Sequence, residues 1–228
     1  MAVLPGSPPL AITLRRSARA RRFSLRVSRV DGRVTLSLPP WAREAEALAF
    51  AREKEGWIRA ALARMPAGRA VVMGGTVLVE GVEVAIRPGT GRAPRIEAGA
   101  LVVPGDADRA AARVAAYLKV LARARLQAAC DRHAGALGRP YTRLTLRDTR
   151  SRWGSCAPDG ALMFSWRLVM APPEVLDYVA AHEVAHLAEM NHSPAFWAVV
   201  ARLLPGYAAP RAWLKRNGHD LHAVSFGD

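Results

Sequence analysis

The stretch PPEVLDYVAAHEVAHLAEMNHSPAFW, residues 172–197, decides how the rest of the chain is interpreted. Within it, residues 182–186 read His-Glu-Val-Ala-His, which is the metal-binding pattern H-E-x-x-H. Residues four apart lie on one face of an α-helix, about 6 Å apart along its axis, so His182 and His186 can reach one metal ion. Glu183 lies about 100° further round the helix, where it can face a water molecule beside that ion.

The residues around this pattern favour a helix with one buried face and one reactive face. Pro172 and Pro173 suit a helix entrance, and Glu174 in the first turn complements the helix dipole. At 100° per residue the apolar positions form one arc, which we expect to be buried in a core: Leu176, Ala180, Val184 and Leu187. The two histidines lie on the neighbouring arc, so packing and chemistry have separate faces.

A catalytic zinc ion usually has three protein ligands and an open position for water, so the pattern needs a third ligand. Glu189 lies about 10 Å beyond His182 along a straight helix, which makes it a poor candidate. His192 follows Asn191, a residue that tolerates the left-handed conformation in which helices end. Ser193–Pro194 would then begin a second helix, and the turn would bring His192 back towards the other two imidazoles. We therefore predict a zinc ion with three imidazole ligands: His182, His186 and His192.

The segment HEVAHLAEMNHSPAFW, together with SRWGSC at 151–156, resembles the YgjP-like/SprT-like (WLM) group of zincin metallopeptidases. In that group H-E-x-x-H is followed, after five residues, by H-S-P-x-F-W. The segments LRRSARARRFSLRV, DGRVTLSLP and EGWIRAAL also resemble the group's N-terminal region, so the resemblance covers roughly residues 10–222. Metzincins share the histidine spacing but have Gly where this chain has Glu189, which argues against membership of that group.

The resemblance implies peptide-bond hydrolysis of a protein or peptide substrate, with zinc on the three histidines and Glu183 as the general base. Two alternatives stay open. SprT-like relatives suggest a DNA-associated protease that acts on DNA-bound proteins. A scaffold that keeps zinc only for stability is the other, although such a site has no use for the base at Glu183.

Composition is that of a soluble globular protein, with 228 residues, 51% hydrophobic and 23% charged. The N-terminus lacks a continuous apolar core of signal-peptide length, and no run approaches the ~20 apolar residues of a membrane helix. We therefore expect a cytoplasmic protein with no membrane partner. Cys130 and Cys156 have no C-x-x-C spacing, so we expect two reduced thiols rather than a disulfide or a cysteine–zinc site.

The formal net charge of +14 is large. Seven arginines lie close together near the N-terminus and would suit nucleic-acid phosphates: Arg15, Arg16, Arg19, Arg21, Arg22, Arg26 and Arg29. A solvated surface is the alternative, because the whole chain is rich in arginine and only Phe23 offers an aromatic ring for stacking within the cluster.

We predict an α+β fold with two units. Residues 1–105 form an antiparallel β-rich unit, with a hairpin around Asp31-Gly32 and one helix over 41–65. Residues 106–228 form a zincin-like helical catalytic unit, which begins with a long helix from Asp106 to about 135. The sequence shows no internal repeat.

A β-hairpin is expected before the helix that carries H-E-x-x-H, with 143–156 and 160–170 as its strands around the Pro158-Asp159-Gly160 turn. In zincins an edge strand beside the active-site helix binds extended peptide through backbone hydrogen bonds. The resemblance implies the same use here, and three residues are candidates to line or brace the substrate site: Arg152, Trp153 and Ser155. Core packing is the alternative role for Trp153, and also for Trp166.

The remaining chemically interesting residues are weaker candidates. We expect a short C-terminal helix capped near Asn217-Gly218, with His219, His222 and Tyr207 as minor candidates for support of the reaction. His133 is expected to be a surface or capping residue rather than a metal ligand.

Overall fold

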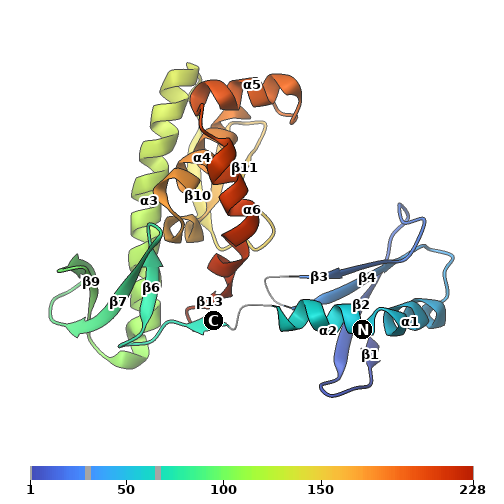
Figure 1. Ribbon diagram of the computed structural model, residues 1–228. Coiled ribbons are helices and arrows are strands. Elements are labelled where there is room, and N and C mark those ends of the chain that lie inside the picture. The colour runs from blue at the N-terminus through green and yellow to red at the C-terminus, as the bar shows by residue number, and fades with distance from the viewer. Residues whose placement is uncertain (1, 29–31, 65–67, 228) are drawn as a thin grey trace. The chain divides into compact units, whose positions relative to one another are not determined.

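The computed structural model describes residues 2–28, 32–64 and 68–227, and it has the mixed α+β architecture that the sequence predicts (Figure 1). The chain folds as two compact units, Met1–Ala67 and Gly68–Asp228. The Asp31 half of the predicted hairpin turn lies outside the described residues.

The first unit is a four-stranded sheet with two helices. Its elements are β1 (Ala2–Leu4), β2 (Leu10–Arg16), β3 (Ser24–Val27), β4 (Val34–Leu38), α1 (Glu44–Glu53) and α2 (Glu55–Ala63). The alternating pattern of β4 buries Val34, Leu36 and Leu38, as a half-buried strand requires. These side chains and Ile58 of α2 share one small core. The single helix predicted over 41–65 is two helices, because the backbone leaves the helical conformation at Lys54.

The second unit begins with strands and continues with helices. Its strands are β5 (Arg69–Ala70), β6 (Thr76–Val79), β7 (Val82–Gly89), β8 (Arg95–Glu97), β9 (Ala100–Pro104), β10 (Arg143–Arg147), β11 (Gly154–Cys156), β12 (Ala161–Ser165) and β13 (Val224–Ser225). Its α-helices are α3 (Ala110–Leu137), α4 (Pro173–Ala185), α5 (Pro194–Leu203) and α6 (Ala208–Ala223), with 3-10 turns η1 (Ala107–Arg109) and η2 (Trp166–Met170).

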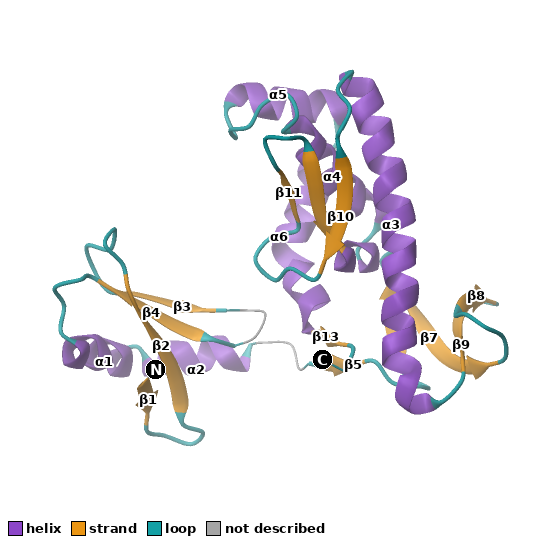
Figure 2. Cartoon of the chain, turned by 180° about the vertical axis from the view of Figure 1, so that it is seen from behind, coloured by secondary structure: helices purple, strands orange, loops and turns teal. Residues whose placement is uncertain are grey.

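The observed division of the chain differs from the predicted boundary after residue 105. The sheet β6–β9 contributes Ile86, Leu101 and Val103 to the same hydrophobic core as α3 and α4, so it belongs with the helices that follow it. Figures 1 and 2 show α3 running from this sheet to the smaller sheet of β10, β12 and β11. The long helix therefore ties both sheets into one unit.

Strand directions are mixed, whereas the sequence predicted antiparallel pairing. The outer pairs β3–β4 and β8–β9 are antiparallel, but β2–β4 and β7–β9 are parallel. The smaller sheet repeats this arrangement, with β10–β12 parallel and β11–β12 antiparallel, so β11 forms an edge. Alternating patterns predict a strand and its buried face but not the direction of its partner, which is why the parallel pairs were missed.

The predicted hairpin before α4 is present only in part. Residues 143–156 form two strands, β10 and β11, joined by a loop, and only β11 pairs antiparallel with β12 across the turn at Gly160. Residues 166–170 form the buried 3-10 turn η2 rather than a continuation of the strand. The break brings a loop, 148–153, close to the end of α6, where the Arg167 guanidinium holds both segments.

Candidate metal centre and active site

Helix α4 carries the first part of the site, and its burial follows the predicted pattern. Leu176, Ala180 and Val184 are buried against the core, while Leu187 is only partly buried. The helix begins with Pro173 at its first turn, as expected. It ends at Ala185, earlier than the predicted break at Asn191, so His186 is the helix C-cap and the turn begins there.

The turn after α4 carries the third histidine. Helix α5 begins as predicted, with Ser193 as N-cap and Pro194 in the first turn, and the Ser193 hydroxyl accepts a hydrogen bond from the Phe196 amide at 3.3 Å. This cap fixes the direction of the chain beside His192.

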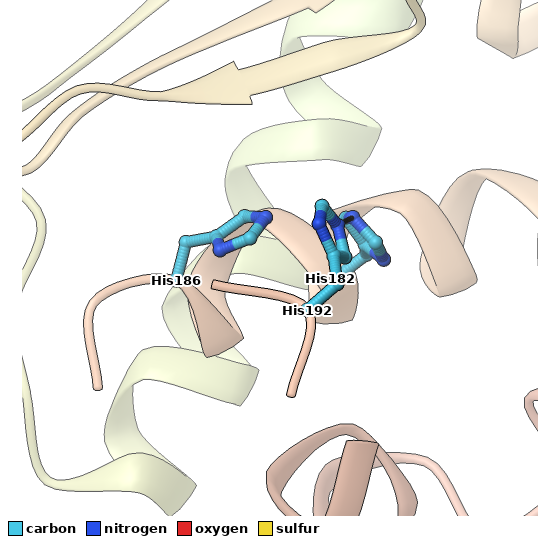
Figure 3. A group of neighbouring side chains, drawn as sticks. All are labelled: His182, His186 and His192. Carbon is cyan, nitrogen blue, oxygen red and sulfur yellow. Dashed lines mark hydrogen bonds between the residues drawn. The ribbon is translucent and has the colours of Figure 1, made fainter. Parts of the chain in front are cut away.

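The structure brings the three histidines together, with one nitrogen from each lying within 4.8 Å of the others (Figure 3). The Nε2 atoms of His182 and His192 are 3.0 Å apart. Two imidazole ligands at neighbouring corners of a zinc tetrahedron would have nitrogens about 3.4 Å apart, from Zn–N distances of about 2.1 Å. The spacing of this pair is therefore close to what one shared metal ion requires.

Burial keeps the imidazoles of His182 and His186 neutral, and a hydrogen bond orients that of His186. Burial, followed by the neighbouring histidines and Arg211, lowers the pKa of His182 to about 4. Burial also lowers the pKa of His186, whose Nδ1 lies 3.0 Å from the Glu189 carbonyl oxygen and leaves Nε2 available. The buried Nδ1 of His182 has no hydrogen-bond partner. Neutral rings with free lone pairs are the state in which histidine binds a metal.

Aromatic rings enclose the cluster on the α5 side. Phe196 is fully buried, and its ring stacks on His186 with centroids 4.5 Å apart. The ring centroid of Trp197 lies 5.8 Å from that of His182, and the Tyr207 ring stacks on Trp197 with centroids 5.6 Å apart. These residues therefore both pack α5 against α4 and exclude water from one side of the imidazoles.

Glu183 lies between α4 and the edge strand β11. Its burial raises the pKa of the carboxyl to about 8, and the charge of Arg152 acts in the opposite direction. A Cβ atom on Gly154 would lie 2.6 Å from both Cγ and Oε1 of Glu183, closer than real Cβ contacts allow. Gly154 therefore supplies the space that the carboxyl occupies. An isolated glycine in a strand signals such close approach, and this was the available clue in the sequence.

The three predicted substrate-site residues do not point to one place. Arg152 and Ser155 line a groove on the open face of the sheet, whereas the Trp153 ring stacks on His222 of α6 at 4.4 Å. Gly218 packs against the same ring, and α6 continues through it to Ala223, so the predicted cap near Asn217-Gly218 is wrong. Trp153 therefore packs against α6. Trp166 is buried in the core.

A buried arginine that the sequence did not suggest anchors the loop that carries Arg152. The Arg167 guanidinium donates to both Asp148 carboxylate oxygens, at 2.6 and 3.0 Å. It also donates to the carbonyl oxygens of Leu221 and Val224 at the end of α6. The loop and the C-terminal segment are thus fixed to one another behind the site.

Several weaker candidates lie outside the cluster. His219 and His222 are not among its members in the described part of the chain, and the Glu189 carboxylate is not either. His133 is buried rather than exposed, and it lies 2.7 Å from Asp177. Burial raises the pKa of Asp177, but the hydrogen bonds and charges of His133 and Arg132 outweigh this effect and bring it below its ordinary 3.8.

Both cysteines are free, as predicted. Burial raises the thiol pKa of Cys130 to about 12 and that of Cys156 to about 11, so neither is a ready nucleophile. None of the described helices combines the length and apolar character of a membrane span.

Three clustered histidines beside a buried glutamate, on an α+β scaffold with an edge strand, define a candidate metallohydrolase. The family model described as "YgjP-like, metallopeptidase domain" matches residues 21–217. The chain therefore belongs to the YgjP-like family, and its domain is a metallopeptidase domain.

Among solved structures, the chain is similar to one described as the metallopeptidase zymogen of Pyrococcus abyssi abylysin. The sequence identity is 20% and the TM-score is 0.36, and the match covers 41% of this chain and 92% of that chain. A comparison with curated proteins gave no match.

Proposed function

We propose that this protein is a zinc-dependent peptidase in which His182, His186 and His192 hold the metal and Glu183 is the general base. The convergence of the three imidazoles within 4.8 Å carries this proposal. The lowered pKa of His182, whose Nε2 lies 3.0 Å from Nε2 of His192, fits a nitrogen-donor site for a divalent metal. Zinc prefers this donor set and four-coordinate geometry, which leaves one position open.

In the proposed mechanism, Glu183 transfers the proton and the edge of β11 positions the substrate. Zinc, when bound, acidifies water and polarises the scissile carbonyl. Glu183 would accept the proton of the attacking water and deliver it to the leaving amine, since the positive charge of a bound metal ion would oppose the effect of burial on its pKa. Such a role contributes roughly 10²–10⁴-fold in typical enzymes. The free edge of β11 would pair with the backbone of an extended peptide and hold the bond beside Glu183.

Metal analysis and a cleavage assay on the same protein samples test the proposal. Glu183→Gln should keep one zinc per chain and lose roughly 10²–10⁴-fold of the peptidase rate, because the ligands stay while the base is lost. Glu174→Gln is the matched control, since it makes the same change at an exposed position of the same helix. A Glu183→Gln variant with wild-type rate would exclude the mechanism, and zinc without any hydrolysis would favour the scaffold alternative.

A DNA-associated protease is the second candidate, favoured by the exposure of the N-terminal arginines. Six of them are exposed around β2 and β3: Arg15, Arg16, Arg19, Arg21, Arg22 and Arg26. Of these, Arg16 also donates to the carbonyl oxygens of Pro40 and Ala42, and Arg29 lies outside the described residues. A gel shift across salt concentrations tests this role, because each neutralised phosphate contributes about 0.9 to the slope of log affinity against log salt. Binding that does not change with salt would exclude it.

A further inference from the structure

The open face of the small sheet carries a basic groove that the proposed peptidase mechanism does not use. The groove has a volume of about 400 Å³, and apolar side chains from β12 and from the residue after β11 form part of its lining. The polar and cationic side chains that line it come from β10, β11 and the loop between them: Arg143, Thr145, Arg147, Thr149, Ser151, Arg152 and Ser155. In the described part of the chain, no acidic residue belongs to this lining.

Two of the three arginines have charges that no salt bridge neutralises. Arg143 forms an exposed pair with Asp159 at 3.2 Å. Arg147 and Arg152 form no salt bridge with any described residue, and the nearby Asp148 is held by Arg167. Thr149 donates to the Arg152 carbonyl oxygen at 2.8 Å, which fixes the loop at the edge of the groove. Arg147 therefore supplies positive charge to the groove, while the charge of Arg152 also acts on the Glu183 carboxyl.

The alternation of β11 connects this groove to the candidate active site. Gly154 faces Glu183 on α4, and Cys156 packs against the core on the same side. Ser155, between them, faces the groove. An extended peptide added to the free edge of β11 alternates in the same way, so every second side chain lies on the groove side of the sheet.

We propose that this groove, lined by Arg147 and Arg152, is a specificity site that binds acidic side chains of the substrate at alternate positions beside the scissile bond. The inference rests on the proposed peptidase function. Carboxylates suit arginine because the guanidinium can donate two parallel hydrogen bonds, and the hydroxyls of Ser151 and Ser155 offer further donors. A volume of about 400 Å³ accommodates side chains rather than a long nucleic-acid strand.

A positional set of fluorogenic decapeptides tests the proposal, with Glu, Gln or Lys placed at each position in turn around one cleavable bond. Attraction within an exposed charge pair should raise kcat/KM for a Glu peptide roughly two- to fivefold, and repulsion should lower kcat/KM for a Lys peptide by a similar factor. The wild-type protein should therefore prefer Glu to Lys about tenfold in kcat/KM at positions two apart, and show no such preference at the positions between them.

Charge reversal of Arg147 assigns the preference to the groove. Arg147→Glu should remove or invert the Glu-to-Lys ratio, and Arg147→Gln should give an intermediate ratio without placing a new acid on the strand. Arg87→Glu is the matched control, since Arg87 is exposed on a strand of another sheet in the same unit and lies outside the groove lining. Cleavage of Glu and Lys peptides at equal rates by the wild-type protein would overturn the inference.

A binding arm separates this inference from the proposed function. Fluorescence anisotropy with the Glu183→Gln protein measures binding of the same peptides in the absence of cleavage. If the wild-type protein cleaves no peptide but Glu183→Gln binds acidic peptides through Arg147, the peptidase proposal fails and the groove stands. Tighter Arg147-dependent binding of a single-stranded DNA 12-mer than of the acidic peptide would overturn the peptide assignment.

Discussion

Gly154 gives the sharpest test of how the strand and the helix form the site together. A Cβ atom at this position would lie 2.6 Å from Cγ and Oε1 of Glu183 and 2.8 Å from Cδ. Ordinary contact begins at 3.4 Å, so Gly154→Ala forces the carboxyl to move by nearly 1 Å. Because Cγ is involved as well as the tip, rotation of the terminal carboxylate alone does not relieve the clash.

We expect this displacement to lower the peptidase rate by about 10²-fold, the loss that a misplacement of about 1 Å can cause. This value lies within the roughly 10²–10⁴-fold that a general base contributes. The zinc content should not change, because the three atoms nearest to the new methyl group all belong to Glu183 and not to a histidine. The assay is kcat and KM on one cleavable peptide, with zinc measured in the same samples.

Two further variants decide whether the effect acts through Glu183. Gly135→Ala is the control, since Gly135 lies in α3 with nothing within 4 Å of the added Cβ. Glu183→Asp shortens the side chain by one methylene and draws the carboxylate away from Gly154. Gly154→Ala should therefore lower the peptidase rate much less in the Glu183→Asp protein than in the wild-type protein. Wild-type kcat in Gly154→Ala, or equal losses in both backgrounds, would refute the steric explanation.

The other predictions concern the metal, the loop anchor and pH. His192→Ala should lose zinc on dialysis, because two imidazoles do not hold a catalytic ion, and metal retention would exclude His192 as a ligand. Arg167→Ala should lower the free energy of unfolding by about 3 kcal/mol, since it leaves Asp148 and two backbone carbonyl groups without their hydrogen-bond donor. The exposed Arg143→Ala should cost less than about 1 kcal/mol in the same denaturant titration. Because the pKa of Asp177 is lower in the folded protein than its ordinary value of 3.8, the ionised carboxylate stabilises the fold at pH values above 3.8. This stabilisation is lost as the pH falls through the pKa of Asp177 in the folded protein. The stability difference between the wild-type protein and Asp177→Asn should therefore shrink from pH 7 towards pH 2, and a constant difference would contradict this.

Short-range patterns predicted the local elements well. The proline entrance of α4, its buried apolar arc and the Ser193 cap of α5 each depend on residues a few positions apart, and each is present. His133 shows where such patterns fail, because its burial against Asp177 depends on a partner 44 residues away. The observed boundary after Ala67 differs from the predicted one after residue 105 for the same reason, because β6–β9 pack on α3, which follows them in the chain.

By itself, the sequence determined that two histidines share one turn of a helix with a glutamate between them, and that a third follows a helix break. Only the tertiary structure decided which strand faces that glutamate, where Arg147 lies relative to it, and that Trp153 turns towards α6. Helical spacing is fixed by local backbone geometry, whereas these contacts depend on strand order and direction, which non-local packing selects.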